Sequence, residues 1–110
     1  MLAYMRRRII EFDFRAKREF NKLDLEVRHK LNKIIGTYAR GENLTRDKFK
    51  ELVSLGLFEF RVKHDNKIYR ALAGKVGSTY IIVLVFNKKS QKIPIRYLRT
   101  AMKRLNQYYD

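Results

Sequence analysis

The 110-residue sequence has no cysteine, no tryptophan and a single proline, and only 11 of its residues are acidic. Without cysteine, the chain has no disulfide framework, no thiolate zinc site and no cysteine nucleophile, as is common in a reducing compartment. The longest apolar run, Tyr80 to Phe86, is far shorter than the roughly 20 residues of a membrane-spanning helix. Residues 1–8 do not build the apolar core of a signal peptide. We therefore expect a soluble cytoplasmic protein with no membrane partner.

The charge of the chain is strongly one-sided, because 26 Lys and Arg residues outnumber 11 Asp and Glu residues and give a formal net charge of +15. On so short a chain this charge creates a positive field that attracts polyanions, and counterion release favours nucleic-acid binding. An acidic protein is the second class of partner that the charge favours. The length suits one hydrophobic core, so we expect a single domain over residues 1–110.

Hydrophobic periodicity predicts an α+β domain. A period of two predicts a strand over residues 8–14, and helical spacing predicts two helices between residues 16 and 41 that form a hairpin. Residues 43–54 read as a polar connection that could contain a helical turn at 47–53. Three strands follow, over residues 57–63, 68–73 and 79–86, and the last is apolar enough to be central and buried on both faces.

Pro94 suits the first turn of a C-terminal helix. The spacing predicts a buried stripe on this helix and places Tyr108 on the surface; the stripe consists of Leu98, Met102, Leu105 and Tyr109. The whole order predicts a helical hairpin packed on a mainly antiparallel four-stranded sheet, followed by the C-terminal helix.

Most familiar catalytic motifs are absent from the sequence, which has no P-loop, HExxH, EF-hand loop or GxSxG elbow. The two histidines, His29 and His64, are interpreted as solvated surface residues. The C-terminal half has few carboxylates with which to build a metal site. We therefore expect neither a metal nor another cofactor.

A convergence of cations and a tyrosine remains. The strand over residues 57–63 points Glu59, Arg61 and Lys63 away from its apolar side. If the strands pair as their turns suggest, Arg61 and Lys63 share one concave edge with groups from the following strand, loop and helix, namely Arg70, Lys88, Lys89, Lys92, Tyr97 and Arg99. Arg96, Arg99 and Lys103 lie on the outward side of the helix. Such an edge could simply bind phosphate as a solvated basic face, or it could cleave RNA.

Cleavage of RNA without a metal requires a base for the ribose 2′-hydroxyl, cations beside the pentacoordinate phosphorane and an acid for the leaving oxygen. Arginine suits the phosphorane because its planar fork pairs with two phosphate oxygens and keeps its proton. A lysine among other cations can act as the base, and a tyrosine can stack on a nucleobase or donate a proton.

Three pieces of sequence are arranged in a distinctive order: Gly56-Leu57-Phe58-Glu59-Phe60-Arg61, then Tyr69-Arg70, then FNKKSQKIP over residues 86–94, followed by Ala101. Together they resemble the RelE/HigB toxin superfamily, in particular its phage-derived HigB-like branch, and the close similarity covers residues 56–104. The resemblance implies a small RelE-like domain that is the toxin of a type II toxin–antitoxin pair. Many such toxins enter the ribosomal A site and cut mRNA there without a metal, leaving a 2′,3′-cyclic phosphate.

The resemblance also implies roles for individual residues. Arg70 matches the arginine that stabilises the phosphate, Arg61 with Lys63 matches a basic pair on the preceding strand, and Lys88 or Lys89 matches the basic residue of the loop. Phosphorane stabilisation would thus fall to Arg70, supported by Arg61 and Lys89, with either Lys63 or Lys88 as the base. Contacts to RNA would come from Lys92, Arg96, Tyr97, Arg99 and Lys103. Where some members keep a tyrosine, this chain has Leu98, next to Tyr97.

The partners that the resemblance implies are mRNA, the ribosome and a cognate antitoxin. In the HigB-like branch the antitoxin usually carries a helix-turn-helix domain, so operator DNA would be bound only through it. The superfamily also includes gyrase inhibitors and chains without known cleavage. The alternative prediction is therefore a non-catalytic member that grips nucleic acid or protein, such as a gyrase-type poison.

Overall fold

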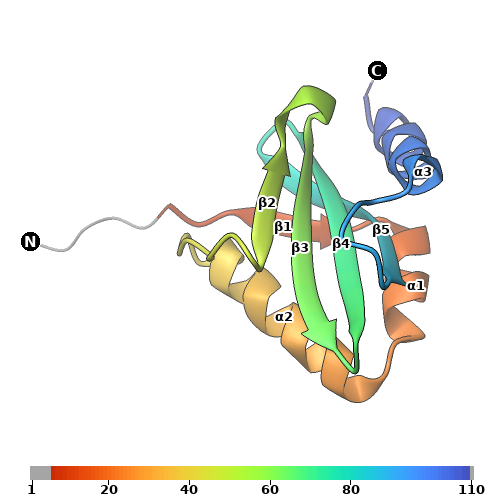
Figure 1. The fold of residues 1–110 in the computed structure, drawn as a ribbon. Helices are drawn as coiled ribbons and strands as arrows, with labels where there is room; N and C mark the ends of the chain where they lie inside the picture. Colours follow the sequence, from red (N-terminus) through yellow and green to blue (C-terminus); the bar gives the residue numbers. More distant parts are fainter. Residues whose placement is uncertain (1–5, 110) are drawn as a thin grey trace, which may run out of the picture.

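The computed structural model of the chain describes residues 6–109, which form a five-stranded sheet and three α-helices (Figure 1). The strands are β1 (Ile9–Phe12), β2 (Phe49–Leu52), β3 (Leu57–His64), β4 (Lys67–Val76) and β5 (Thr79–Lys88). The helices are α1 (Phe14–Asn21), α2 (Leu25–Ala39) and α3 (Ile95–Asn106), and a 3-10 turn, η1, spans Val53–Leu55. The strand order is β1-β5-β4-β3-β2. Strand β1 runs parallel to β5, and the other neighbouring pairs are antiparallel.

The sequence predicts four strands, and the structure has five because residues 49–52 form β2 instead of a helical turn. Phe49 lies opposite Phe60 of β3, and its ring stacks on Tyr38 of α2 with centroids 4.4 Å apart. The two middle residues of β2, Lys50 and Glu51, are both exposed. A four-residue edge strand with this pattern lacks the period of two, so it resembles a polar connection.

The predicted first strand was too long, because Asp13 ends it and begins a helix. The Asp13 carboxylate accepts hydrogen bonds from the backbone N–H of Arg15 at 2.9 Å and of Ala16 at 3.4 Å. This is the usual action of an N-cap residue, and Phe14 consequently belongs to α1. The helical hairpin follows as predicted, with the apolar stripe of α2 buried from Val27 to Tyr38.

Strands β3 and β4 are joined by the two-residue turn Asp65-Asn66, whose φ angles are 49° and 62°. Two positive φ values are the signature of a type I′ turn, which matches the twist of a hairpin. Strand β4 continues to Val76, beyond its predicted end at residue 73. Between β4 and β5 the register shifts at Leu72 and Ala73, so Val83 is an extra residue on β5.

The sheet is covered on both faces. Helices α1 and α2 pack on one face around Leu31, Phe60 and Ile82, and α3 packs on the other face through Ala101 and Leu105. Strand β5 lies between β1 and β4 and is buried from Ile81 to Phe86, as its apolar run predicts. Tyr109 does not belong to the buried stripe of the last helix: α3 ends at Asn106, and Tyr109 is 49% exposed.

A glycine lets α3 lie close to the sheet, since a Cβ atom at Gly74 would collide with the side chain of Leu105. In the part of the chain from residue 6 to 109, no helix has the length and apolar character needed to cross a membrane.

Candidate functional site

Cationic side chains from β3 and β5 lie in adjacent rows at the end of the sheet next to the β3–β4 turn. In one row Arg61 lies opposite Arg70; in the next, Lys63 lies opposite Ile68, which lies opposite Lys88. Directly opposed residues point to the same face of a sheet, here the face that α3 covers. Because neighbouring strands are ~4.8 Å apart, the backbones of Lys63 and Lys88 are separated by roughly 10 Å. The register therefore brings these predicted site residues to one end of one face.

Arg70 lies within this face and is completely buried, with 0% of its surface exposed. Its Nε donates to Oε2 of Glu59 at 2.7 Å, and its Nη2 donates to the carbonyls of Ser90 at 2.9 Å and Gln91 at 2.7 Å. Among residues 6–109, Nη1 is buried and finds no hydrogen-bond acceptor. The guanidinium thus ties the loop after β5 to the sheet.

The expectation that Arg70 lies on an open concave edge is corrected by this burial, and its partner Glu59 is itself only 2% exposed. The physical reason is that the loop after β5 and helix α3 cover the polar face of β3 and β4. In this conformation a phosphate cannot reach the Arg70 guanidinium.

The loop after β5 carries Lys89 and Lys92 into solvent and is also held by Arg61, whose Nη2 donates to the side-chain oxygen of Gln91 at 3.1 Å. A hollow of about 570 Å³ lies between this loop and the β3–β4 turn. Its walls include Lys63, Lys89 and Gln91. Arg61, Lys63 and Lys89 are therefore brought together around the end of the hairpin.

The Tyr97 ring at the start of α3 stacks on Phe86 of β5, with ring centroids 4.2 Å apart and planes inclined by 6°. The Nζ of Lys88 lies 5.7 Å and the Cζ of Arg96 lies 4.8 Å from the centroid of the Tyr97 ring. The Arg96 guanidinium, together with the charge of Lys88, lowers the pKa of the Tyr97 phenol because both cations stabilise the phenolate. The phenol therefore releases its proton more readily than a free tyrosine.

The other predicted RNA contacts are exposed cations on and before α3. Arg96, Arg99 and Lys103 follow one another at helical spacing on its exposed side, and Lys92 precedes them in the loop. Within residues 6–109, none of these four side chains forms an ion pair with a carboxylate. They form a basic stripe that leads away from Tyr97 along the helix.

His64, interpreted from sequence as a solvated residue, is instead only 13% exposed and joins the β3–β4 turn to α2. Its Nε2 lies 3.3 Å from Glu26, and its Nδ1 lies 3.1 Å from Nζ of Lys30. No sequence signal marked these contacts, because they join residues that are far apart in the chain. In the described range 6–109, no three His, Cys, Asp or Glu side chains are grouped as metal ligands.

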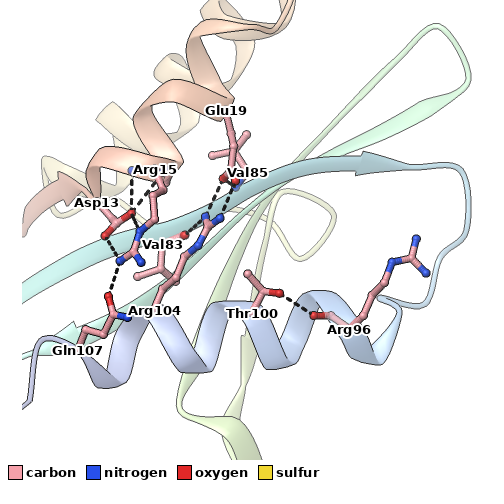
Figure 2. A network of polar contacts seen from close by, with 10 residues as sticks. Asp13, Arg15, Glu19, Val83, Val85, Arg96, Thr100, Arg104 and Gln107 are labelled. Carbon is pink, nitrogen blue, oxygen red and sulfur yellow. Dashed lines mark hydrogen bonds and ion pairs between the residues drawn. The ribbon is translucent and has the colours of Figure 1, made fainter.

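The far end of α3 is fixed by a network around Asp13 (Figure 2). The side chain of Arg15 donates to both oxygens of Asp13, at 3.0 and 2.8 Å, and to the Gln107 side chain at 2.7 Å. The Tyr108 hydroxyl donates to Oδ2 of Asp13 at 2.6 Å. Burial by itself would raise the pKa of Asp13, but the hydrogen bonds from Arg15, Tyr108 and the backbone outweigh it and hold that pKa well below its usual range.

A second part of this network joins α3 to α1 and β5. The Nη1 of Arg104 donates to Oε1 of Glu19 at 3.0 Å and to the carbonyl of Val83 at 2.8 Å, while the N–H of Val85 donates to Oε1 of Glu19 at 3.0 Å. Figure 2 shows Arg104 reaching from the helix to both partners, and Arg96 extending away from the opposite end of α3. These contacts attach the far end of α3, opposite to the end that carries Tyr97, to α1 and β5.

Comparison with solved structures identifies the fold as RelE-like. The crystal structure of the isolated Escherichia coli RelE toxin, in its P21 form, is similar over 89% of this chain and 98% of that chain, with a TM-score of 0.52 and 20% sequence identity. The family described as "Phage derived protein Gp49-like (DUF891)" matches residues 18–106. The chain belongs to this phage-derived Gp49-like family. No curated protein matches the chain at a significant level.

Proposed function

We propose that this chain is the toxin of a type II toxin–antitoxin pair, related to the HigB-like branch, and that it cleaves mRNA at the ribosome without a metal. The observation that carries the proposal is the cationic end of the sheet. Lys63 and Lys89 line the hollow there, Arg61 bonds Gln91 of the same loop, and Lys88 lies 5.7 Å from the ring of Tyr97, a phenol with a lowered pKa. Membership of the Gp49-like family and a fold shared with a RelE toxin support the same class.

In the proposed reaction, the 2′-oxygen of the substrate attacks the adjacent phosphorus and the 5′-oxygen of the next nucleotide leaves. The products are a 2′,3′-cyclic phosphate and a 5′-hydroxyl end. Arg61 and Lys89 neutralise the charge of the phosphorane, and either Lys63 or Lys88 accepts the proton of the 2′-hydroxyl. Tyr97 donates a proton to the leaving oxygen, a role that its lowered pKa favours.

The exposed cations of α3 and its preceding loop hold the RNA strand in this proposal. Lys92, Arg96, Arg99 and Lys103 contact successive phosphates, so their contribution should weaken as the salt concentration rises. Antitoxin binding blocks the same cationic surface, and operator DNA is reached only through the antitoxin.

Arg70 acts as a positioning residue, because its guanidinium fixes the carbonyls of Ser90 and Gln91 and hence the loop that bears the lysines. Among residues 6–109 its Nη1 has no acceptor, so a buried donor remains beneath that loop. An outward movement of the loop would give this donor the contact with phosphate that the resemblance implies for Arg70.

The test is cleavage of a defined mRNA by the full chain, with and without ribosomes, followed by analysis of the RNA ends. We expect cyclic phosphate ends, and a loss of rate of about 100-fold or more for whichever of Lys63→Gln and Lys88→Gln removes the base. Tyr97→Phe should also slow cleavage, while Lys22→Gln, an exposed lysine between α1 and α2, should not. Ends bearing a 3′-hydroxyl, or wild-type rates in all site variants, would contradict the mechanism.

A non-catalytic function remains the second candidate, and the complete burial of Arg70 is the observation that favours it. A chain of this kind would arrest growth by gripping its target, for example as a gyrase-type poison. It would show salt-dependent binding and stabilised gyrase–DNA complexes, with no new RNA ends. Mapping of RNA ends and of gyrase-linked DNA breaks after expression separates the two functions.

A further inference from the structure

A second hollow of about 570 Å³ lies between α2, the connection that precedes β2, and β3. Helix α2 covers the face of the sheet opposite to α3, so this hollow does not contain the Tyr97 stack. It shares Lys30 and Lys63 with the hollow beside the loop after β5, and Arg61 also lines it. The pairing of β2 with β3 ends at Phe60, so Arg61 and Lys63 lie at the edge of the sheet, where they border both faces.

The rim of this α2–β3 hollow is strongly positive. Five cations surround it: Lys30, Lys33, Lys48, Arg61 and Lys63. Within residues 6–109, none of these five forms an ion pair with a carboxylate. Among the described residues 6–109, Asp47 is the one acidic group in the lining, and its pKa is lowered by the hydrogen bond from Thr45 and by the nearby charges of Lys48 and Lys63. So many uncompensated like charges repel one another, and an anionic occupant would relieve that repulsion.

The apolar part of the lining indicates whether the anion is a nucleic acid or an acidic protein segment. It consists of Ile34, Leu44 and Val62, and among residues 6–109 no aromatic side chain lines the hollow. Single-stranded RNA is typically held by stacking its bases on aromatic rings, which this hollow lacks. Aliphatic side chains between lysines instead match a protein segment that alternates acidic and aliphatic residues.

The backbone at this place also suits an extended segment. The pairing of β2 with β3 ends at Phe49 and Phe60, and Arg61 N–H donates to the carbonyl of Lys48 at 2.9 Å. Farther along β3, the carbonyl of Lys63 accepts from Nζ of Lys30 at 3.3 Å, a contact with a flexible side chain and not with a strand. An extended peptide can lie along such an edge and alternate its side chains between solvent and the hollow.

We infer that the α2–β3 hollow receives an extended segment of acidic and aliphatic residues from a partner protein. The identity of that partner as the antitoxin rests on the proposed function. Because Arg61 and Lys63 line this hollow as well as standing in the candidate site, carboxylates bound here draw both cations away from a substrate phosphate. This contact lowers activity in addition to the blocking of the cationic surface of α3 by the same partner.

The inference is tested by binding three probes to the full chain: acetyl-(Leu-Glu)₄-amide, acetyl-(Leu-Gln)₄-amide and an eight-residue uridine RNA. We expect the Glu peptide to bind at least tenfold more tightly than the Gln peptide, and to shift the methyl NMR signals of Leu44 and Val62. The double variant Lys33→Glu/Lys48→Glu should bind the Glu peptide at least tenfold more weakly than the unmodified chain does. The control variant Lys22→Glu/Lys75→Glu has the same net charge, and its two exposed positions lie outside the hollow. Its affinity for the Glu peptide should fall much less.

Equal loss in the two double variants, or no binding of the Glu peptide, overturns the inference. RNA binding that depends on Lys33 and Lys48 while peptide binding does not would assign the hollow to nucleic acid instead. Cleavage of mRNA is measured separately, and the Lys33→Glu/Lys48→Glu variant should retain it because neither residue is in the proposed catalytic group. Absence of cleavage in the unmodified chain would contradict the proposed function. The peptide-binding result would still decide whether the hollow binds an acidic segment.

Discussion

Two polar networks, one at the loop that precedes α3 and one at the far end of α3, differ in how deeply their side chains are buried. In the first network, Arg70 and Glu59 are 0% and 2% exposed, and Arg70 donates to the loop carbonyls of Ser90 and Gln91. In the second, the side chains of Arg15 and Arg104 are 26% and 16% exposed, although the Asp13 side chain is enclosed. Water can replace a lost partner in the second network far more easily than in the first. The loop that bears the lysines of the candidate site is therefore the segment whose position depends on a fully buried ion pair.

The largest effect in this comparison should come from Arg70→Met. This change leaves the Glu59 carboxylate buried without its cation and removes the donor to two loop carbonyls. We expect the free energy of unfolding to fall by about 3–5 kcal/mol, measured by urea denaturation. The double variant Arg70→Met/Glu59→Leu should recover most of that loss, because no charge is left uncompensated. A double variant as unstable as the single one would show that packing, not charge, is the cause.

A smaller effect is expected from Asp13→Asn at the other end of α3. The neutral amide keeps the shape of the cap but loses the charge-assisted hydrogen bonds from Arg15. Since Arg15 is partly exposed, the loss of unfolding free energy at neutral pH should be about 1–2 kcal/mol. A loss as large as that of Arg70→Met would remove the distinction between the two networks.

The same variant should change the dependence of stability on acid. The folded state holds the pKa of Asp13 below its ordinary value of 3.8, so the ionised carboxylate stabilises the fold above that value and this contribution is lost as the pH falls further. Thermal melts between about pH 5 and pH 2 should therefore show a steeper decline for the wild type than for Asp13→Asn. If the melting temperatures of the two proteins fall equally with pH, other carboxylates determine the loss of stability in acid.

The smallest effect should come from Tyr108→Phe, which removes one hydrogen bond to Asp13. We expect a loss of ~1 kcal/mol by urea denaturation. Tyr109→Phe is the matched control: its hydroxyl donates to the carbonyl of Lys75, and the residue is 49% exposed, so water replaces the lost donor. Equal losses in the two variants would indicate that the enclosure of Asp13 adds nothing to the Tyr108 bond.

The elements with strong periodicity were predictable from sequence, and those whose form depends on a neighbour were not. The stripe from Val27 to Tyr38 and the apolar run of β5 have unambiguous patterns, and both are buried as predicted. Strand β2 forms because Phe49 pairs with Phe60 and packs on Tyr38. These partners are distant in sequence, so the four residues of β2 do not by themselves predict a strand.

The sequence predicted that these cations share one face of the sheet, but not how deeply each side chain is buried. The I′ turn at Asp65-Asn66 fixes Arg61 opposite Arg70, so the sharing of one face by the cations follows from the hairpin itself. The same register places Glu59 diagonally beside Arg70, and this lone acid on a basic strand was the available sign of an internal ion pair. No local pattern in the sequence predicts that the loop after β5 packs over Arg70 and accepts its hydrogen bonds.

The parallel pairing of β1 with β5 constrains the order in which the molecule can assemble. Ile9 to Phe12 pair with Thr79 to Ile82, which lie about 70 positions later in the sequence. Joining these two strands closes a long loop of chain, and the entropy of that closure is lost before the pairing can stabilise the sheet. The antiparallel pairs of β3 with β4 and of β4 with β5 join segments that are close in sequence. These two hairpins can therefore form first, and β1 completes the sheet after them.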